Sequence, residues 1–343
     1  MPTLTDVFAP DAFSVYELTA AIQKIPYAPN SINASGLFRA IPIKTTTAVI
    51  EEQNGTLALI PTSQRGGPGT PGADPKRKVT NLTVPHIQVD DSVMADDALN
   101  TRAFGSNEVM SGVSEIVARK LQTASQSIDA TQEYLKMGAL NGVVAYPTDS
   151  VTADLNLFTE FGATEVEVDF LLTTPATAVL ESIIPSVQRA MQTALGGTPF
   201  SGINALCGTA FFESLISHAE VQEAYRDQQA LLATAAAVAP VRPGGPQRKV
   251  FLGGIWFEEY YGDVSATDFL DTDTARFYPT GTDIFHTYLA PADFTEAAGT
   301  LGQPKYARQY AAPDGKSVVL ETQVNPLSIC TRPGALIKGN RIS

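Results

Sequence analysis

A stripe of apolar residues on a helical period is the longest pattern in the chain and runs through residues 106–138. Its members follow one another at helical spacing: Val109, Val113, Val117, Leu121, Ala124, Ile128 and Leu135. This pattern predicts one helix, with Ser106 as its N-cap and Gly138 to Gly142 as its C-terminal break. About 32 residues at about 1.5 Å each make a rod about 48 Å long. A rod of that length must lie across the surface of a domain.

A shorter amphipathic pattern lies near the N-terminus, in residues 12–25. Phe13, Tyr16, Leu18 and Ile22 recur at helical spacing, and Pro26 then ends the pattern. The turn-rich segment that follows separates this helix from the rest of the chain. We interpret the helix as an arm that packs on something other than its own domain, and an ordinary core helix is the alternative.

Two predicted strands flank a long polar segment. Residues 37–60 favour a strand with a turn at Gln53, Asn54 and Gly55, and residues 79–89 favour a returning strand. Between them, residues 61–78 contain four prolines and four glycines. A loop this long inside a compact domain is usually functional or disordered. The pattern therefore predicts a long hairpin that projects from the body of the protein.

The rest of the chain mixes short strands and helices. The predicted helices are 176–195, opened by Pro175 and ended by Gly196, and 209–228. The predicted strands are a two-stranded stretch at 143–161, an alternating segment at 165–170, a buried strand at 203–207, and the segments 249–261, 275–278, 283–288, 306–310 and 317–322. This order indicates an α+β protein.

Composition and charge narrow the possible functions. The 343 residues are 44% hydrophobic, which is enough to bury a core, and the net charge is −13. An acidic chain is unsuited to holding nucleic acid by neutralising phosphates. Cys207 and Cys330 are too few for a disulfide framework and fit a reducing compartment. We expect neither a secretory signal nor a membrane span.

The sequence offers little chemistry, and we predict no catalytic residue, no cofactor and no metal site. A nucleophile would need a histidine base, yet His86 follows Pro85 in a predicted strand, His218 lies on a predicted helix, and His286 lies between Phe285 and Thr287. The cysteines have no second ligand at zinc spacing, and the acidic segment 268–273 lacks the glycine and glutamate of a calcium loop.

The predicted hairpin contains a cluster of glycines and a cluster of basic residues. Gly66, Gly67 and Gly69 are not followed by the Lys-Ser or Lys-Thr pair of a phosphate loop, so they form a flexible tip. Lys76, Arg77 and Lys78 form a basic cluster in an acidic chain. A solvated patch is the ordinary interpretation, and docking on an acidic surface of a neighbouring subunit is our functional hypothesis.

Ordered motifs along the chain carry a family resemblance. They include Arg65-Gly66-Gly67-Pro68-Gly69, Val84-Pro85-His86-Ile87, Arg102-Ala103-Phe104-Gly105, Gly138-Ala139-Leu140-Asn141-Gly142, Gly253-Gly254-Ile255-Trp256-Phe257-Glu258, a run from Tyr288 to Phe294, and an Asn325-Pro326-Leu327 close followed by Cys330-Thr331-Arg332-Pro333. No single motif is specific, but their order and spacing are. The chain resembles the lambda-type (major capsid protein E) family of tailed bacteriophages.

The resemblance implies the Hong Kong 97-like capsid fold. The expected parts are an N-terminal arm at 1–36, an extended loop at 37–90 that reaches over a neighbouring subunit, a peripheral domain at 91–200 with the spine helix 106–138, an axial domain at 201–305, and C-terminal strands at 306–343 that return to the peripheral domain. Expected contacts between subunits involve Arg65, Gly66, Gly67, Lys76, Arg77, Lys78, Phe13 and Tyr16. No enzyme activity is implied.

The implied function is that of a major head protein. Copies would assemble as hexamers and pentamers into an icosahedral shell around double-stranded DNA, without sequence-specific binding and without a membrane. Scaffolding, decoration and portal proteins are further candidate partners. The shell would form in the host bacterial cytoplasm and end in the virion. Two alternatives remain, a nanocompartment shell of encapsulin type around protein cargo and a soluble hydrolase that uses one of the three histidines.

Overall fold

A computed structural model describes most of the chain. It covers Leu18, Thr19, Ile22 and residues 31–54, 76–94, 109–146, 154–174, 178–224, 248–261, 263–264, 267–313 and 317–342, with the backbone alone at 31, 51–54, 76–78, 109–114, 263–264 and 267–268. The chain divides into two compact units. Unit 1 comprises 1–48, 82–133 and 287–328, and unit 2 comprises 49–81, 134–286 and 329–343.

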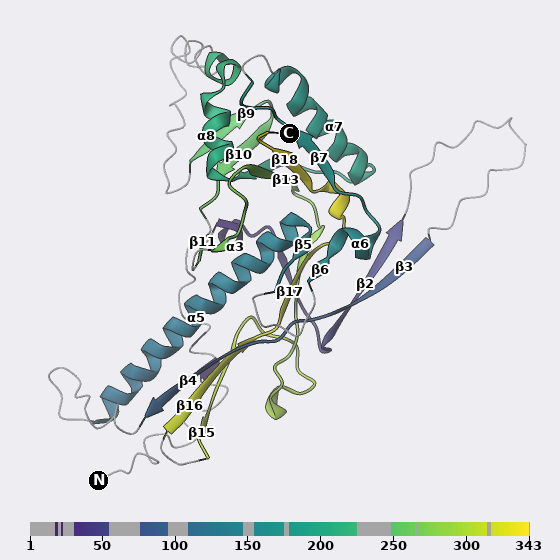
Figure 1. Cartoon of the computed structure of the whole chain (residues 1–343). Helices are drawn as coiled ribbons and strands as arrows, with labels where there is room; N and C mark the ends of the chain where they lie inside the picture. The colour runs from purple at the N-terminus through teal and green to yellow at the C-terminus, as the bar shows by residue number, and fades with distance from the viewer. Residues whose placement is uncertain are drawn as a thin grey trace, which may run out of the picture. The chain divides into compact units, whose positions relative to one another are not determined.

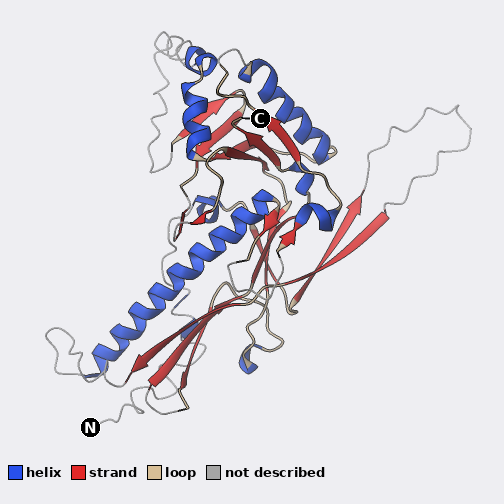
Figure 2. Cartoon of the chain, viewed as in Figure 1, coloured by secondary structure: helices blue, strands red, loops and turns tan. Residues whose placement is uncertain are grey.

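Helices and strands are mixed along the whole chain (Figure 2), as the sequence predicts for an α+β protein. The first half contains α3 (Ser31–Ser35), β1 (Arg39–Pro42), β2 (Thr47–Asn54), β3 (Lys76–Thr83), β4 (Ile87–Met94), α5 (Val109–Asn141), β5 (Val143–Val144), β6 (Leu155–Asn156), α6 (Leu157–Phe161) and β7 (Val166–Asp169). In the part of the chain that the structure describes, no helix is long and apolar enough to cross a membrane.

The second half contains η1 (Val179–Ile183), α7 (Ile184–Leu195), β8 (Gly202–Cys207), α8 (Thr209–Ser217), β9 (Lys249–Leu252), β10 (Ile255–Glu259), β11 (Asp263–Val264), β12 (Thr267–Asp268), β13 (Thr274–Thr280), β14 (Phe285–Leu289), η2 (Thr295–Ala297), β15 (Tyr306–Ala311), β16 (Ser317–Val324), β17 (Pro326–Cys330), η3 (Pro333–Ala335) and β18 (Ile337–Asn340). Strands β17 and β18 were not predicted individually. β17 is buried at every position, so it shows no alternation, and β18 alternates in burial but is only four residues long.

Helix α5 is the predicted long helix (Figure 1), and its 33 residues give a rod about 50 Å long. The described part of the predicted apolar stripe is buried, including Val117, Leu121, Ile128 and Leu135. The predicted N-cap, Ser106, lies outside the described residues. A stripe with a 3.6-residue period therefore identified the longest element of the fold.

The predicted break at Gly138 to Gly142 is confirmed at its last residue, because α5 continues past the predicted end at residue 138 to Asn141. A Cβ atom at Gly138 would lie 3.0 Å from the carbonyl oxygen of Val143, so this glycine permits close approach of the following chain. Gly142 ends the helix with a φ of 78°, where a Cβ would lie 2.1 Å from the ring of Phe158. Both glycines are therefore required sterically, but only the second is the stop signal.

Strand β16 is the centre of an antiparallel sheet in unit 1, with the order β15-β16-β4. One face of this sheet packs on the first part of α5. The buried cluster there consists of Leu18, Ile22, Val93, Ile116, Val117, Leu121, Ala307 and Leu320. The other face is polar and pairs Glu321 with Arg308 of β15 and with Asp90 of β4. Successive side chains of β16 alternate between these two faces, as expected for a strand with one face on the core.

The N-terminal segment contributes to this cluster. Leu18 and Ile22 are buried in it, and the Thr19 Oγ1 atom both donates to the carbonyl oxygen of Ala307 and accepts from its N–H, each at 3.2 Å. Leu18 and Ile22 are therefore core residues of the single chain, as expected from the alternative interpretation of this segment as an ordinary core helix. Phe13 and Tyr16 lie outside the described residues, so the arm at 1–36 stays a prediction.

Strands β2 and β3 form a two-stranded sheet, which is the predicted long hairpin. The predicted turn at residues 53–55 is wrong in its position, because β2 includes Gln53 and Asn54. Pairing with β3 outweighs the turn propensity of Asn-Gly, since each added pair satisfies backbone groups of both strands. The hairpin tip lies outside the described residues.

A six-stranded mixed sheet forms the core of unit 2, in the order β7-β18-β13-β8-β10-β9. Phe277 of β13 lies at its centre, stacked on Phe170 with ring centroids 5.5 Å apart and edge-on to Phe257 at 5.7 Å. Phe170 also meets Phe211 of α8 edge-on at 5.2 Å. The aromatic rings therefore join the sheet to helix α8.

Two predicted helices of unit 2 differ from expectation. The predicted helix 176–195 is a π-helical turn, η1, followed by α7, and it ends at Gly196 with a φ of 57° as predicted. The predicted helix 209–228 is broken, because α8 ends at Ser217 and His218 has an extended conformation before a second helical segment at 219–224. The break lets Glu220 accept hydrogen bonds from the N–H groups of Val179 and Leu180, at 2.6 and 3.1 Å.

Candidate assembly surfaces

The predicted contact residues are only partly described by the structure. Arg65, Gly66, Gly67, Phe13 and Tyr16 lie outside the described residues. The backbone of Lys76, Arg77 and Lys78 lies in β3, but their side chains are not described. These residues therefore stay predicted contacts.

The hairpin of β2 and β3 carries one buried and one exposed face near its base. Ala48 and Ile50 are buried on one face and Leu82 on the same side of the ribbon, whereas Val49 and Val79 are more than half exposed. A two-stranded ribbon gains little stability by itself. Its exposed valines are suited to contact with another protein surface.

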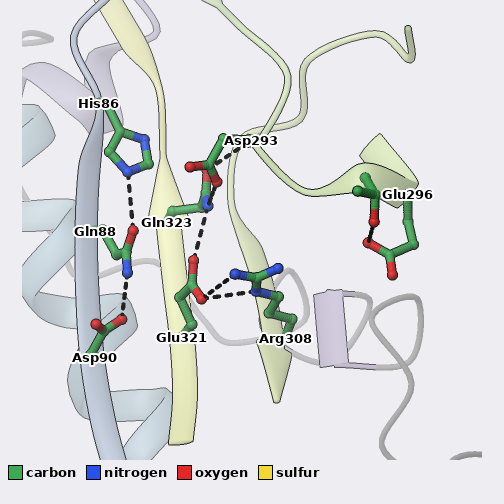
Figure 3. A network of polar contacts seen from close by, with 9 residues as sticks. His86, Gln88, Asp90, Asp293, Glu296, Arg308, Glu321 and Gln323 are labelled. Atoms are coloured by element: carbon green, nitrogen blue, oxygen red, sulfur yellow. Dashed lines mark hydrogen bonds and ion pairs between the residues drawn. The ribbon is translucent and has the colours of Figure 1, made fainter. Parts of the chain in front are cut away.

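A network of polar side chains covers the second face of the β15-β16-β4 sheet (Figure 3). Arg308 of β15 donates from Nε to Oε2 of Glu321 in β16 at 2.8 Å, and the Nη2 atom of Arg308 lies 2.7 Å from the same oxygen. The guanidinium also lies over the ring of Phe294, 4.2 Å from the centroid. Glu321 is almost completely buried, so this arginine supplies its compensating charge.

The network continues through two amides, one in β16 and one just after its end. Gln323 donates to Asp293 at 2.7 Å, and Asn325 donates to the carbonyl oxygen of Pro291 at 2.9 Å. Both amides are buried, and both hold the loop that follows β14 against the sheet. These hydrogen bonds therefore hold the loop after β14 on the β15-β16-β4 sheet.

Glu133 of α5 caps a second helix in unit 1. Its two carboxylate oxygens accept hydrogen bonds from the N–H groups of Ile32 and Asn33, each at 2.9 Å, at the start of α3. The amide of Asn33 donates to the carbonyl oxygen of Asp129 at 3.2 Å. A carboxylate at a helix N-terminus satisfies N–H groups that have no partner within the helix.

Replacing Glu133 by alanine is expected to loosen α3. The variant leaves two partly buried N–H groups without their acceptor, at a cost of about 1–3 kcal/mol. Amide hydrogen exchange at Ile32 and Asn33 should accelerate at least tenfold, while exchange at Ile203 in unit 2 should not change. Glu133→Gln keeps one acceptor oxygen and should have a smaller effect. Equal exchange in all three proteins would contradict the capping role.

Each of the three histidines has an oxygen atom as a hydrogen-bond partner. His86 lies just before β4, not inside a strand as predicted, and its Nδ1 is 2.9 Å from Asn325 Oδ1. His218 Nε2 lies 3.3 Å from the carbonyl oxygen of Thr174, and His286 Nε2 lies 3.2 Å from Asp283. These contacts fit structural roles for all three side chains. The described residues also contain no cluster of three His, Cys, Asp or Glu side chains that could hold a metal ion.

Both cysteines are free thiols with no exposed surface. Burial raises the pKa of Cys330 to about 12 and raises the pKa of Cys207 well above its usual value. We expect neither thiol to react with a thiol-specific dye at pH 8 while the protein is folded. Both should react after denaturation in guanidinium chloride. Rapid labelling of the folded protein would contradict the described burial.

The comparisons with known proteins agree on one family. The family model described as phage major capsid protein E matches residues 14–341. The major capsid protein of Pseudomonas phage KPP10 is 28% identical, over 95% of this chain and 96% of that protein. The major capsid protein of Salmonella phage Felix O1 is 26% identical, over 95% of each chain.

A solved structure with low sequence identity to this chain also supports the fold. The putative capsid protein of a prophage from E. coli CFT073 aligns with a TM-score of 0.55 at 13% identity, over 98% of this chain and 97% of that chain. Long helix α5, the hairpin of β2 and β3, and the two sheets thus form the Hong Kong 97-like capsid fold predicted from the sequence. The chain belongs to the phage major capsid protein E family.

Proposed function

We propose that this protein is the building block of the icosahedral head of a tailed phage or prophage. Copies would associate as hexamers and pentamers and close into a shell around double-stranded DNA. The observation that carries this proposal is the family match across residues 14–341. Two exposed valines on the β2 and β3 hairpin, Val49 and Val79, support it, because a neighbouring subunit could cover them.

The charge of the chain supports enclosure of DNA without direct binding. A net charge of −13 opposes the phosphate backbone, so DNA inside the shell would be held by confinement. We propose a structural role for this chain, with assembly in the bacterial cytoplasm before the finished head becomes part of the virion. The role of the basic cluster at Lys76, Arg77 and Lys78 in docking on a neighbour remains our hypothesis.

Electron microscopy and sedimentation of the purified recombinant chain test this proposal. Closed particles built from five-fold and six-fold rings, or rings that close when a scaffold is added, are the expected result. A stable monomer of 36.4 kDa under every condition would overturn it.

The contents of the particle distinguish phage heads from protein nanocompartments. We expect particles from induced host cells to contain double-stranded DNA that resists nuclease until the shell is opened. Shells that contain a copurifying enzyme and no DNA would favour the nanocompartment. The two curated relatives are major capsid proteins of phages, which supports the first outcome.

A further inference from the structure

Two edges of the six-stranded sheet in unit 2 carry exposed apolar side chains. At the β9 edge, Phe251 and Trp256 are cross-strand partners with ring centroids 4.9 Å apart, and they are 44% and 42% exposed. At the β7 edge, Leu171 lies two residues after the end of β7 and Ile342 lies two residues after the end of β18, and they are 37% and 50% exposed. Large aromatic side chains at an edge strand are unusual unless another surface covers them.

Backbone geometry also marks the β7 edge. Among the described non-glycine residues, Leu171 is the one with a positive φ, at 48°. A bulky residue in this region of φ and ψ costs free energy, and such strain occurs most often at functional positions. The chain continues beside the C-terminal segment at this point, because the N–H of Phe170 donates to Asn340 and the N–H of Leu172 donates to Arg341. The exposed Asp169 lies two residues before Leu171.

The two edges present opposite charges to solvent. At the β9 edge, Lys249 pairs with Glu258 at 2.8 Å, and the lysine is 49% exposed while the glutamate is 14% exposed. At the β7 edge, Glu167 pairs with Lys338 at 3.3 Å, and here the glutamate is 48% exposed while the lysine is 26% exposed. The outward charge is therefore positive at one edge and negative at the other.

Neighbouring charges agree with this assignment. Asp169 adds a second exposed carboxylate to the β7 edge, and Asn340 donates to both acidic residues, at 3.0 and 3.1 Å. The hydrogen bond from Asn340 helps to lower the pKa of Glu167 below its usual value. At the other edge, Arg248 pairs with the buried Glu259 and the exposed Glu213. Arg248 and Glu259 are the chain neighbours of the paired Lys249 and Glu258, so they project from the opposite face of the sheet.

We propose that the β9 edge of one copy packs against the β7 edge of the next copy. Lys249, Phe251 and Trp256 would face Glu167, Asp169 and Leu171, with apolar groups against apolar groups and opposite charges in register. Such a contact joins two different surfaces, so it is heterologous and generates a ring when the rotation between copies closes. This inference rests on the proposed function and names a surface that builds its rings.

Paired charge reversals test the proposal without removing either internal ion pair. Lys249→Glu with Glu258→Lys keeps the pair but reverses the outward charge of the β9 edge, and Glu167→Lys with Lys338→Glu does the same at the β7 edge. Each paired variant should need at least tenfold more protein to reach half assembly, measured by sedimentation velocity. Combining all four substitutions should restore assembly to within about threefold of the unchanged protein, because the charges are again complementary.

The outcomes separate the two proposals. Assembly of both paired variants at the concentration that the unchanged protein needs would overturn this interface and leave the proposed function intact. Failure of the unchanged protein to form rings or shells would overturn both. Circular dichroism and thermal unfolding should match across the set, since each ion pair is retained.

Crosslinking gives a second measurement that does not depend on charge reversal. Lys249→Cys with Glu167→Cys places two thiols on opposite edges of one sheet, about 24 Å apart at about 4.8 Å per strand, which is too far for a bond within one chain. The native thiols are buried. Oxidised particles should therefore yield a ladder of covalent multimers, and monomers alone after oxidation of assembled particles would contradict the contact.

Discussion

Replacing Lys305 by methionine is expected to lower the free energy of unfolding by about 3–5 kcal/mol, because it leaves a buried carboxylate without its cation. Lys305 Nζ lies 2.6 Å from Asp129 Oδ1 and 2.6 Å from Ser125 Oγ, and Asp129 has no exposed surface. Among the described residues, neither oxygen of Asp129 accepts a hydrogen bond of ordinary geometry. The ammonium group of Lys305 therefore supplies the compensating charge for this buried carboxylate.

A double variant separates the ion pair from simple loss of packing. Asp129→Leu alone should destabilise the protein as strongly as Lys305→Met alone, since it leaves the ammonium group unpaired. The two changes together remove both charges and should restore most of the lost stability. Urea titrations of the four proteins provide the comparison. Losses that simply add in the double variant would show that the two side chains act independently.

Phe277→Ala is expected to have a similarly large effect in the other unit, about 3–5 kcal/mol. Phe277 is fully buried, and its ring contacts Phe170 and Phe257 in the centre of the six-stranded sheet. Removing the ring leaves a cavity beside two rigid aromatic side chains, and the surrounding strands restrict its collapse.

Phe251→Ala is a matched control on the same sheet. Its side chain is nearly half exposed, so the isolated chain should lose less than about 1 kcal/mol. Chemical denaturation of the unassembled protein measures both variants. If Phe251→Ala cost as much as Phe277→Ala, the assignment of inner and outer faces of this sheet would be incorrect.

The sequence predicted the fold through its long periodic elements. Helix α5 was found because a stripe that extends over several turns has no other regular explanation. Helix α7 was located by its glycine at position 196, which adopts the left-handed conformation that ends a helix. The break was confirmed at Gly142, but the helix continues past its predicted end at residue 138, because a glycine needed for close approach looks the same in sequence as one needed for a stop.

The surfaces were harder to predict than the fold. The predicted contacts relied on composition, such as the basic cluster at residues 76–78, which does not reveal its surroundings. The pair of Phe251 and Trp256 was missed because alternating aromatic residues indicate a strand without showing which face is covered. Exposure of Lys249 and burial of Glu258 depend on packing between segments distant in sequence. The positions of these residues in the sequence could therefore not have predicted which charge is exposed.

The most direct test of the account is a cryo-electron microscopy reconstruction of particles assembled from this chain. We predict an icosahedral shell whose five-fold and six-fold rings contain one chain per position, each with α5 as a continuous helix of about 50 Å and the β2 and β3 hairpin in contact with an adjacent subunit. Particles without five-fold and six-fold rings, or a hairpin that contacts only its own chain, would contradict the account.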